Sequence, residues 1–127
     1  MIEVQLKQII NNMNVLKKLS EAQFKGKTAF QIARLLKNIE AEVDIFNTTR
    51  MKLLHQYAET DENGELKVDE KNNYIIKKEC QVEFIKEMDE VMNNKIQINA
   101  EKIDYKDIEN VEFTPSEAMA LEPFIEF

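Results

Sequence analysis

The sequence predicts a mainly α-helical protein with a small β component. We expect an antiparallel helical bundle, or a coiled-coil hairpin, that carries a β-hairpin at its tip and is followed by a short capped helix. Three observations predict this fold. Residues 28–57 lack Gly and Pro and place apolar side chains with 4-3 spacing, residues 59–77 combine turn residues with alternating apolar positions, and residues 114–117 form a helix-capping pattern.

The length and the composition predict one domain over residues 1–127. Apolar residues make up 43% of the chain and charged residues 32%, which is enough for one hydrophobic core. We expect three parts within it: a helical pair over 1–58, the β-hairpin over 59–77, and a helix with a short strand and helix tail over 78–127. No internal repeat is expected.

A first helix is predicted over residues 3–19. Its apolar residues follow the 3-4-3 spacing of one helix face: Leu6, Ile9, Met13 and Leu16. Gly26 is one of two glycines in the chain, and we expect it to separate this helix from the next.

The second predicted helix gives the strongest signal. Thr28 and Gln31 match a capping box at its start. Its stripe then runs through Ile32, Leu36, Ile39, Val43, Phe46, Arg50, Leu53 and Tyr57. A helix of this length spans roughly 45 Å at 1.5 Å per residue. Either the neighbouring helices cover the stripe in a bundle, or part of it forms a dimer seam in which Arg50 sets the register, and we expect a homodimer.

Residues 59–77 predict a β-hairpin between two helices. The pair Asn63-Gly64 is typical of a β-turn. Strands are expected at 66–68 and 74–76, on either side of a five-residue loop. Helical periodicity resumes over 78–94.

The C-terminal segment is predicted to alternate short strands with capped turns. Strands are expected at 96–99 and 111–113, with a turn capped by Asp104 between them. Thr114, Pro115 and Glu117 then start a short helix that ends at 121 or 122, where Pro123 obstructs it. The last apolar residues are expected to dock on this chain or on a partner: Phe124, Ile125 and Phe127.

Charge and hydropathy restrict the partners. The net charge is −7, with nine Lys or Arg against five Asp or Glu over residues 1–58, and eight against nineteen over 59–127. This balance disfavours nucleic acid. No apolar run is long enough for a membrane span, and no signal peptide is recognisable, so the cytoplasm of the cell is the expected location.

The sequence offers little catalytic chemistry, and we predict no enzyme, metal or cofactor site. One His and one Cys are too few for the usual zinc clusters. The alternative is a small enzyme in which His55 and Cys80, near facing helix ends, form a Cys–His pair.

Two stretches carry a resemblance. The first stretch is the run from Asp61 to Asp69 after a long helix, followed by Tyr74-Ile75-Ile76-Lys77. The second and more specific stretch is the ending from Phe113 to Glu126. With these two stretches the chain resembles a family of small phage and prophage proteins of Gram-positive bacteria whose function is not established. The resemblance implies a phage context and transfers no site residue.

We therefore expect a non-enzymatic phage protein that binds another protein in the host cytoplasm. Its role would be either inhibition of a host defence protein or virion assembly as a factor or chaperone. The residues assigned to partner binding are polar or aromatic positions of the long helix and hairpin and apolar positions of the tail: Arg50, Tyr57, Tyr74, Leu121, Phe124, Ile125 and Phe127.

Overall fold

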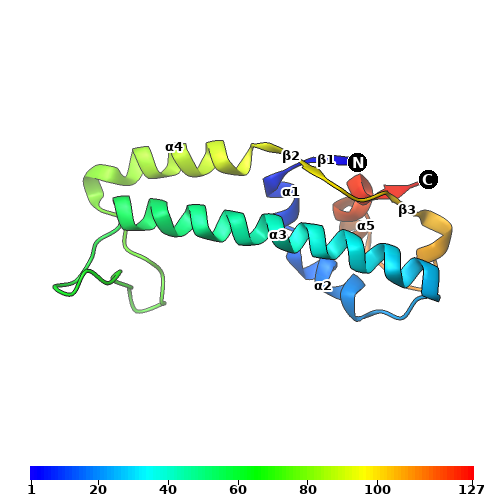
Figure 1. The fold of residues 1–127 in the computed structure, drawn as a ribbon. Coiled ribbons are helices and arrows are strands. Elements are labelled where there is room, and N and C mark those ends of the chain that lie inside the picture. Colours follow the sequence, from blue (N-terminus) through cyan, green and yellow to red (C-terminus); the bar gives the residue numbers. More distant parts are fainter. The chain divides into compact units, whose positions relative to one another are not determined.

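The computed structural model describes residues 1–127 and is mainly α-helical with small β elements, which confirms the predicted fold class (Figure 1). Its contacts divide the chain into two compact units. Unit 1 comprises Met1–Val43 with Asn94–Phe127, and unit 2 comprises Asp44–Asn93. Both units contain part of the long helix α3 (Gly26–Tyr57).

The N-terminal segment of unit 1 is a strand followed by two short helices, and the prediction of one helix over 3–19 is wrong. β1 (Ile2–Gln5) pairs antiparallel with β2 (Lys95–Ile98), with Ile2 opposite Ile98. The reason is the alternation of apolar and polar residues in β1, which buries Ile2 and Val4 while Glu3 stays exposed. The predicted strand over 96–99 is confirmed within one residue.

Two asparagines interrupt the helical stretch that follows β1. α1 (Leu6–Ile10) ends at Asn11, and α2 (Met13–Glu21) begins after Asn12. The Asn12 side-chain amide donates to the Gln8 carbonyl at 2.6 Å, which replaces a helical backbone bond by a local side-chain bond.

Helix α3 is confirmed, although it starts two residues before the predicted position. Thr28 lies inside its first turn and is therefore not the capping residue that the capping-box pattern predicts. The unit 1 part of the helix contributes three buried side chains to the core: Ile32, Leu35 and Ile39. These side chains belong to one apolar cluster with the buried residues of α2: Val15, Leu16 and Leu19.

The C-terminal part of unit 1 begins with β3 (Ile103–Asp104) and a 3-10 turn over Tyr105–Ile108. The Asp104 carboxylate accepts from the Lys106 amide at 2.9 Å, so the predicted capped turn is confirmed. The predicted strand over 111–113 is wrong. No neighbouring strand pairs with these residues, and the Glu112 carbonyl instead accepts a bond from the Lys18 ammonium.

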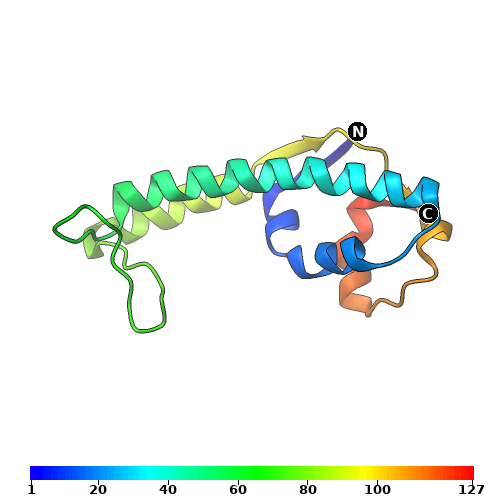
Figure 2. The same cartoon turned by 60° about the horizontal axis from the view of Figure 1, so that its bottom comes forward.

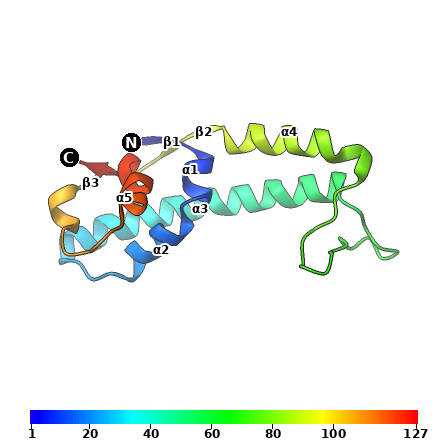
Figure 3. The same ribbon diagram turned by 180° about the vertical axis from the view of Figure 1, so that it is seen from behind.

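The predicted capped helix is confirmed as α5 (Pro115–Leu121), with Thr114 and Glu117 forming the capping box. A 3-10 turn over Glu122–Phe124 follows, because a proline at 123 cannot donate the bond that would continue the α-helix. β4 (Ile125–Glu126) then pairs parallel with β3 (Figure 3).

The expectation that the tail docks is confirmed for its first residues, which dock on this chain. Leu121 and Ile125 are buried, and Phe124 has no exposed surface at all. Phe127, in contrast, is 83% exposed.

Unit 2 contains the second half of α3 and helix α4 (Gln81–Met92), which run antiparallel in Figures 1 and 2. A 3-10 turn over Lys78–Cys80 precedes α4, and together they confirm the helix predicted over 78–94. The Tyr57 and Phe84 rings meet edge to face, with centroids 6.4 Å apart.

The segment between these helices is a three-way backbone junction, so the simple two-stranded hairpin prediction is incomplete. Three antiparallel bridges join Ala58 with Ile76, Thr60 with Leu66, and Val68 with Tyr74. At their centre, three amides and three carbonyls close a ring: Glu59 donates to Ile75 at 2.7 Å, Lys67 to Glu59 at 3.0 Å, and Ile75 to Lys67 at 3.3 Å.

Two arms of the junction share one turn geometry, and they are visible as the two loops in Figure 2. The Asp61 carboxylate accepts from the amides two and four residues later, at 2.8 and 3.0 Å, and Asp69 does the same at 2.8 and 3.0 Å. Gly64 and Asn72 both take a positive φ, of 79° and 63°. Asn tolerates a positive φ better than most non-glycine residues, so Asn72 can stand where the first arm has a glycine.

None of the helices combines the length and the apolar composition that crossing a lipid bilayer requires.

Removing the Phe124 ring should destabilise unit 1 strongly. Phe124→Ala leaves a cavity in the core and should lower the free energy of unfolding by about 3–5 kcal/mol. The matched control is Phe30→Ala, because Phe30 is 75% exposed and its loss should change stability by less than about 0.5 kcal/mol. Urea unfolding followed by circular dichroism measures both, and equal effects of the two variants would contradict the burial of Phe124.

Candidate functional site

Unit 1 carries an apolar pocket of about 400 Å³ that is formed entirely by residues 105–127. It combines the turn after β3, the extended chain before α5, one face of α5 and the chain end after the turn at Pro123. Its lining residues are Tyr105, Ile108, Glu109, Val111, Phe113, Ala118, Leu121, Ile125 and Phe127.

Strand pairing brings the aromatic rim of the pocket together. In the parallel pair of β3 and β4, Ile103 lies opposite Ile125 and Asp104 lies opposite Glu126. The next residues after the two strands are Tyr105 and Phe127, which therefore lie side by side. Their ring centroids lie 5.7 Å apart with a tilt of 33°. Both rings remain accessible, with exposed fractions of 48% and 83%, so an incoming apolar group meets aromatic surface first.

The inner wall of the pocket consists of core residues. Ile108, Leu121 and Ile125 are all at most 5% exposed and belong to the apolar cluster of unit 1. Because packed core side chains have little freedom to move, the wall of the pocket is fixed before anything binds.

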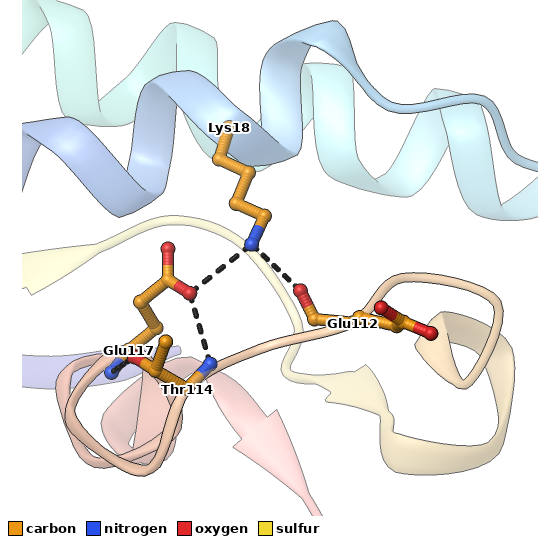
Figure 4. Close-up of polar contacts among 4 residues, drawn as sticks. All are labelled: Lys18, Glu112, Thr114 and Glu117. Atoms are coloured by element: carbon orange, nitrogen blue, oxygen red, sulfur yellow. Dashed lines mark hydrogen bonds and ion pairs between the residues drawn. The ribbon is translucent and has the colours of Figure 1, made fainter.

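A polar network centred on Lys18 of α2 holds the start of α5 in place (Figure 4). The Lys18 ammonium donates to the Glu112 carbonyl at 2.6 Å and to the Glu117 carboxylate at 3.1 Å. It also lies 5.3 Å from the centre of the Phe113 ring. The same carboxylate accepts from the Thr114 amide at 2.9 Å, so one side chain of α2 orients both Phe113 and α5 at the pocket.

The charge of Glu117 is stabilised by this arrangement. The hydrogen bond from the Thr114 backbone amide is the main cause that lowers the pKa of the Glu117 carboxyl, and the Lys18 ammonium lowers it further. The carboxylate is therefore the form that the folded protein prefers.

The segment that forms the pocket is acidic. Residues 101–127 contain two lysines and no arginine against eight Asp or Glu. One of these, Glu109, is among the pocket residues. An apolar pocket within an acidic segment is complementary to a ligand that has one apolar group with positively charged groups around it.

The residues predicted to bind a partner fall into two groups, one in each unit. In unit 1, Leu121, Ile125 and Phe127 line the pocket, whereas Phe124 lies beneath them in the core and lines no surface. The other pocket residues were not predicted, and the only signal that could have indicated them is the apolar spacing of Ile108, Val111 and Phe113 after the Asp104 turn.

The second group lies in unit 2 and is engaged in contacts within the chain. The Arg50 guanidinium lies 5.7 Å from the centre of the Tyr74 ring, a cation–π contact. The loss of hydration around Tyr57 raises the pKa of its hydroxyl, and the nearby Glu87 carboxylate adds to this effect. These contacts give Arg50, Tyr57 and Tyr74 a structural role, and partner binding by them stays a prediction.

His55 and Cys80 occupy different surroundings in unit 2. The His55 side chain is exposed on α3, and Cys80 is a half-buried free thiol just before α4. No hydrogen bond joins them, and the chain has no group of three or more His, Cys, Asp or Glu side chains arranged to hold a metal ion.

No protein-family model, curated protein or solved structure matches this chain. The function of the chain is therefore inferred from the geometry of the pocket and the charge around it.

Glu117→Gln should remove a pH-dependent part of the stability. Because folding lowers the pKa of this carboxyl, its contribution is present above the ordinary glutamate pKa of 4.5 and is lost as the pH falls through the lower value in the folded protein. Glutamine keeps a capping oxygen but not the charge. The wild type should therefore melt at a higher temperature than the variant at pH 7, and the difference should shrink as the pH falls below 4.5 and through the lowered pKa.

Glu112→Gln is the control for this measurement, because Glu112 reaches Lys18 through its backbone carbonyl and the substitution leaves that bond intact. A melting difference between wild type and Glu117→Gln that persists at low pH, or an equal effect of Glu112→Gln, would contradict the charge effect.

Proposed function

We propose that this protein is a non-enzymatic protein-interaction module that docks its partner in the pocket formed by residues 105–127. The observation that carries the proposal is the pocket itself: about 400 Å³, apolar, backed by core residues and rimmed by two exposed aromatic rings. Pockets with these properties are typical binding sites, and exposed aromatic residues are enriched where proteins meet.

The partner is a protein segment with one large apolar side chain flanked by Lys or Arg. The apolar side chain fills the pocket and contacts Tyr105 and Phe127. The basic residues face the acidic segment 101–127, whose excess of six negative charges attracts them.

A phage context, supported by the resemblance of the hairpin and the C-terminal segment to phage proteins, leads to two roles for such a module. We favour inhibition of a host defence protein in the host cytoplasm. Residues 59–127 carry a net charge of −11, and an acidic surface of this size can occupy a basic groove that otherwise holds nucleic acid. Virion assembly is the other role, and the identity of the bound partner separates the two.

A random peptide library tests the docking mode directly. The wild-type protein should enrich peptides that combine a large apolar residue with flanking Lys or Arg, and their binding should weaken as salt rises. Ala118→Trp fills the pocket from α5 and should weaken these peptides by at least about tenfold, as expected when a central anchor loses its site. Ala33→Trp, at an exposed position of α3, is the matched control and should bind like the wild type.

Enrichment of acidic peptides, or equal binding by both tryptophan variants, would contradict this docking mode. Peptides that pass the test can then be used to compete with proteins captured from phage-infected cells. Displaced host nucleases or effectors support inhibition, and displaced virion proteins support assembly.

We further propose that the protein forms a homodimer through α4, and not through a seam along the stripe of α3 that the sequence suggests, because Ile32, Ile39 and Phe46 of that stripe are buried within the single chain. Helix α4 contains no buried residue, and Val82 and Ile85, one turn apart, are 76% and 58% exposed. Covering such residues with a second copy removes apolar surface from water.

Light scattering should give twice the chain mass of 14.9 kDa, and the double variant Val82→Glu with Ile85→Glu should give the monomer mass. A wild-type mass of 14.9 kDa throughout the micromolar range would overturn the dimer.

A further inference from the structure

An apolar groove of about 370 Å³ lies between α2 and the unit 1 part of α3. Both helices line it with side chains spaced three and four residues apart, so each helix presents one continuous face to the groove. Its apolar lining residues are Met13, Leu16, Leu36, Ile39 and Val43. Leu16 and Ile39 belong to the buried core, whereas Met13 is 41% exposed, and Leu36 and Val43 are half-buried. A groove between two packed helices is suited to a third, amphipathic helix.

Helix α4 of unit 2 presents a surface of the matching kind. Its exposed apolar residues, Val82 and Ile85, lie one turn apart. Lys86 follows Val82 by four residues, and Asp89 follows Ile85 by four, so the four side chains share one helix face. All four are exposed. This face of α4 therefore consists of one apolar turn followed by one charged turn.

Charge decides between the two surfaces of a second copy that could cover this face. Helix α4 contains four Asp or Glu against one lysine, so two α4 helices packed against each other would each bring a net charge of −3. Residues 13–43, which contain both walls of the groove, hold six Lys or Arg against three Asp or Glu, a net charge of +3. Packing α4 against the groove therefore joins opposite charges, whereas packing α4 against α4 joins like charges.

The rim of the groove carries one charge of each sign. Lys17 of α2 and Glu40 of α3 line the groove, and both side chains are exposed. Neither forms an ion pair within the chain, and the same holds for Lys86 and Asp89 of α4. With the apolar turn of α4 in the groove, Asp89 can pair with Lys17 and Lys86 can pair with Glu40.

From these observations we propose that α4 of one copy docks in the groove between α2 and α3 of a second copy. Val82 and Ile85 fill the groove, and the two charges of the next turn pair with its rim. This assignment rests on the homodimer proposed above and names the surface that covers α4. Each copy offers one groove and one α4, so two copies make the same contact twice and close as a symmetric dimer.

NOEs between copies test the contact in a dimer made from equal amounts of methyl-labelled and unlabelled full-length chains. The Val82 and Ile85 methyl groups of one copy should give NOEs to the side chains of Leu36 and Val43 of the other. NOEs between the α4 helices of the two copies would overturn the groove assignment and leave the dimer intact. A wild type that is monomeric in light scattering would overturn both, and would leave the groove to an amphipathic helix of another protein.

Exchanging the charges of one rim pair tests the same contact through the Kd of the dimer. Lys17→Glu and Asp89→Lys should each raise this Kd by roughly tenfold, because a symmetric dimer contains the pair twice and each substitution turns attraction into repulsion. The double variant that carries both substitutions restores opposite charges and should recover most of the affinity. Lys37→Glu is the matched control, because Lys37 is an exposed residue of α3 that does not line the groove, and it should change the Kd by about twofold at most. Equal losses in Lys17→Glu and Lys37→Glu, or no recovery in the double variant, would overturn the assignment.

Discussion

The burial of Phe124 in the core of unit 1 is the constraint on which the rest of that unit depends. This residue lies three positions from the last residue of the sequence, yet its side chain has no exposed surface. The apolar cluster to which it belongs includes Ile2 and Ile9 from the first ten residues and Leu35 from α3. Unit 1 is therefore closed by segments from opposite ends of the sequence, and unit 2 occupies the interval between them. The loop-closure entropy of such a core is offset by the size of the apolar cluster.

The candidate site inherits its geometry from that core. The apolar pocket rests on Leu121 and Ile125, which flank Phe124 in the sequence and belong to the same apolar cluster. The groups available to a ligand, the Tyr105 and Phe127 rings, lie at the edge of a densely packed region. Pre-organised groups lose little freedom on binding, which favours affinity.

Sequence patterns predicted the elements whose signals are local. Helix α3 follows from its apolar spacing, and α5 follows from Thr114 and Glu117, whose side chains bond each other's backbone amides within four residues. β1 was missed because Ile2 and Val4 fit a helical stripe as well as an alternating strand, and only pairing with β2, more than ninety residues away, selects the strand. The pocket was missed for the same reason: Tyr105 and Phe127 meet only because two dipeptide strands, β3 and β4, pair in parallel.

Unit 2 is stabilised in a different way, because few of its side chains are buried and its turns cannot depend on a hydrophobic core. Its junction is instead built from backbone bonds that close a ring through Glu59, Lys67 and Ile75, and from two carboxylates that each satisfy two amides. Such local bonds specify a conformation with little apolar burial. The turn that the two arms share therefore needs only an aspartate at its start and a residue that accepts positive φ at its fourth position.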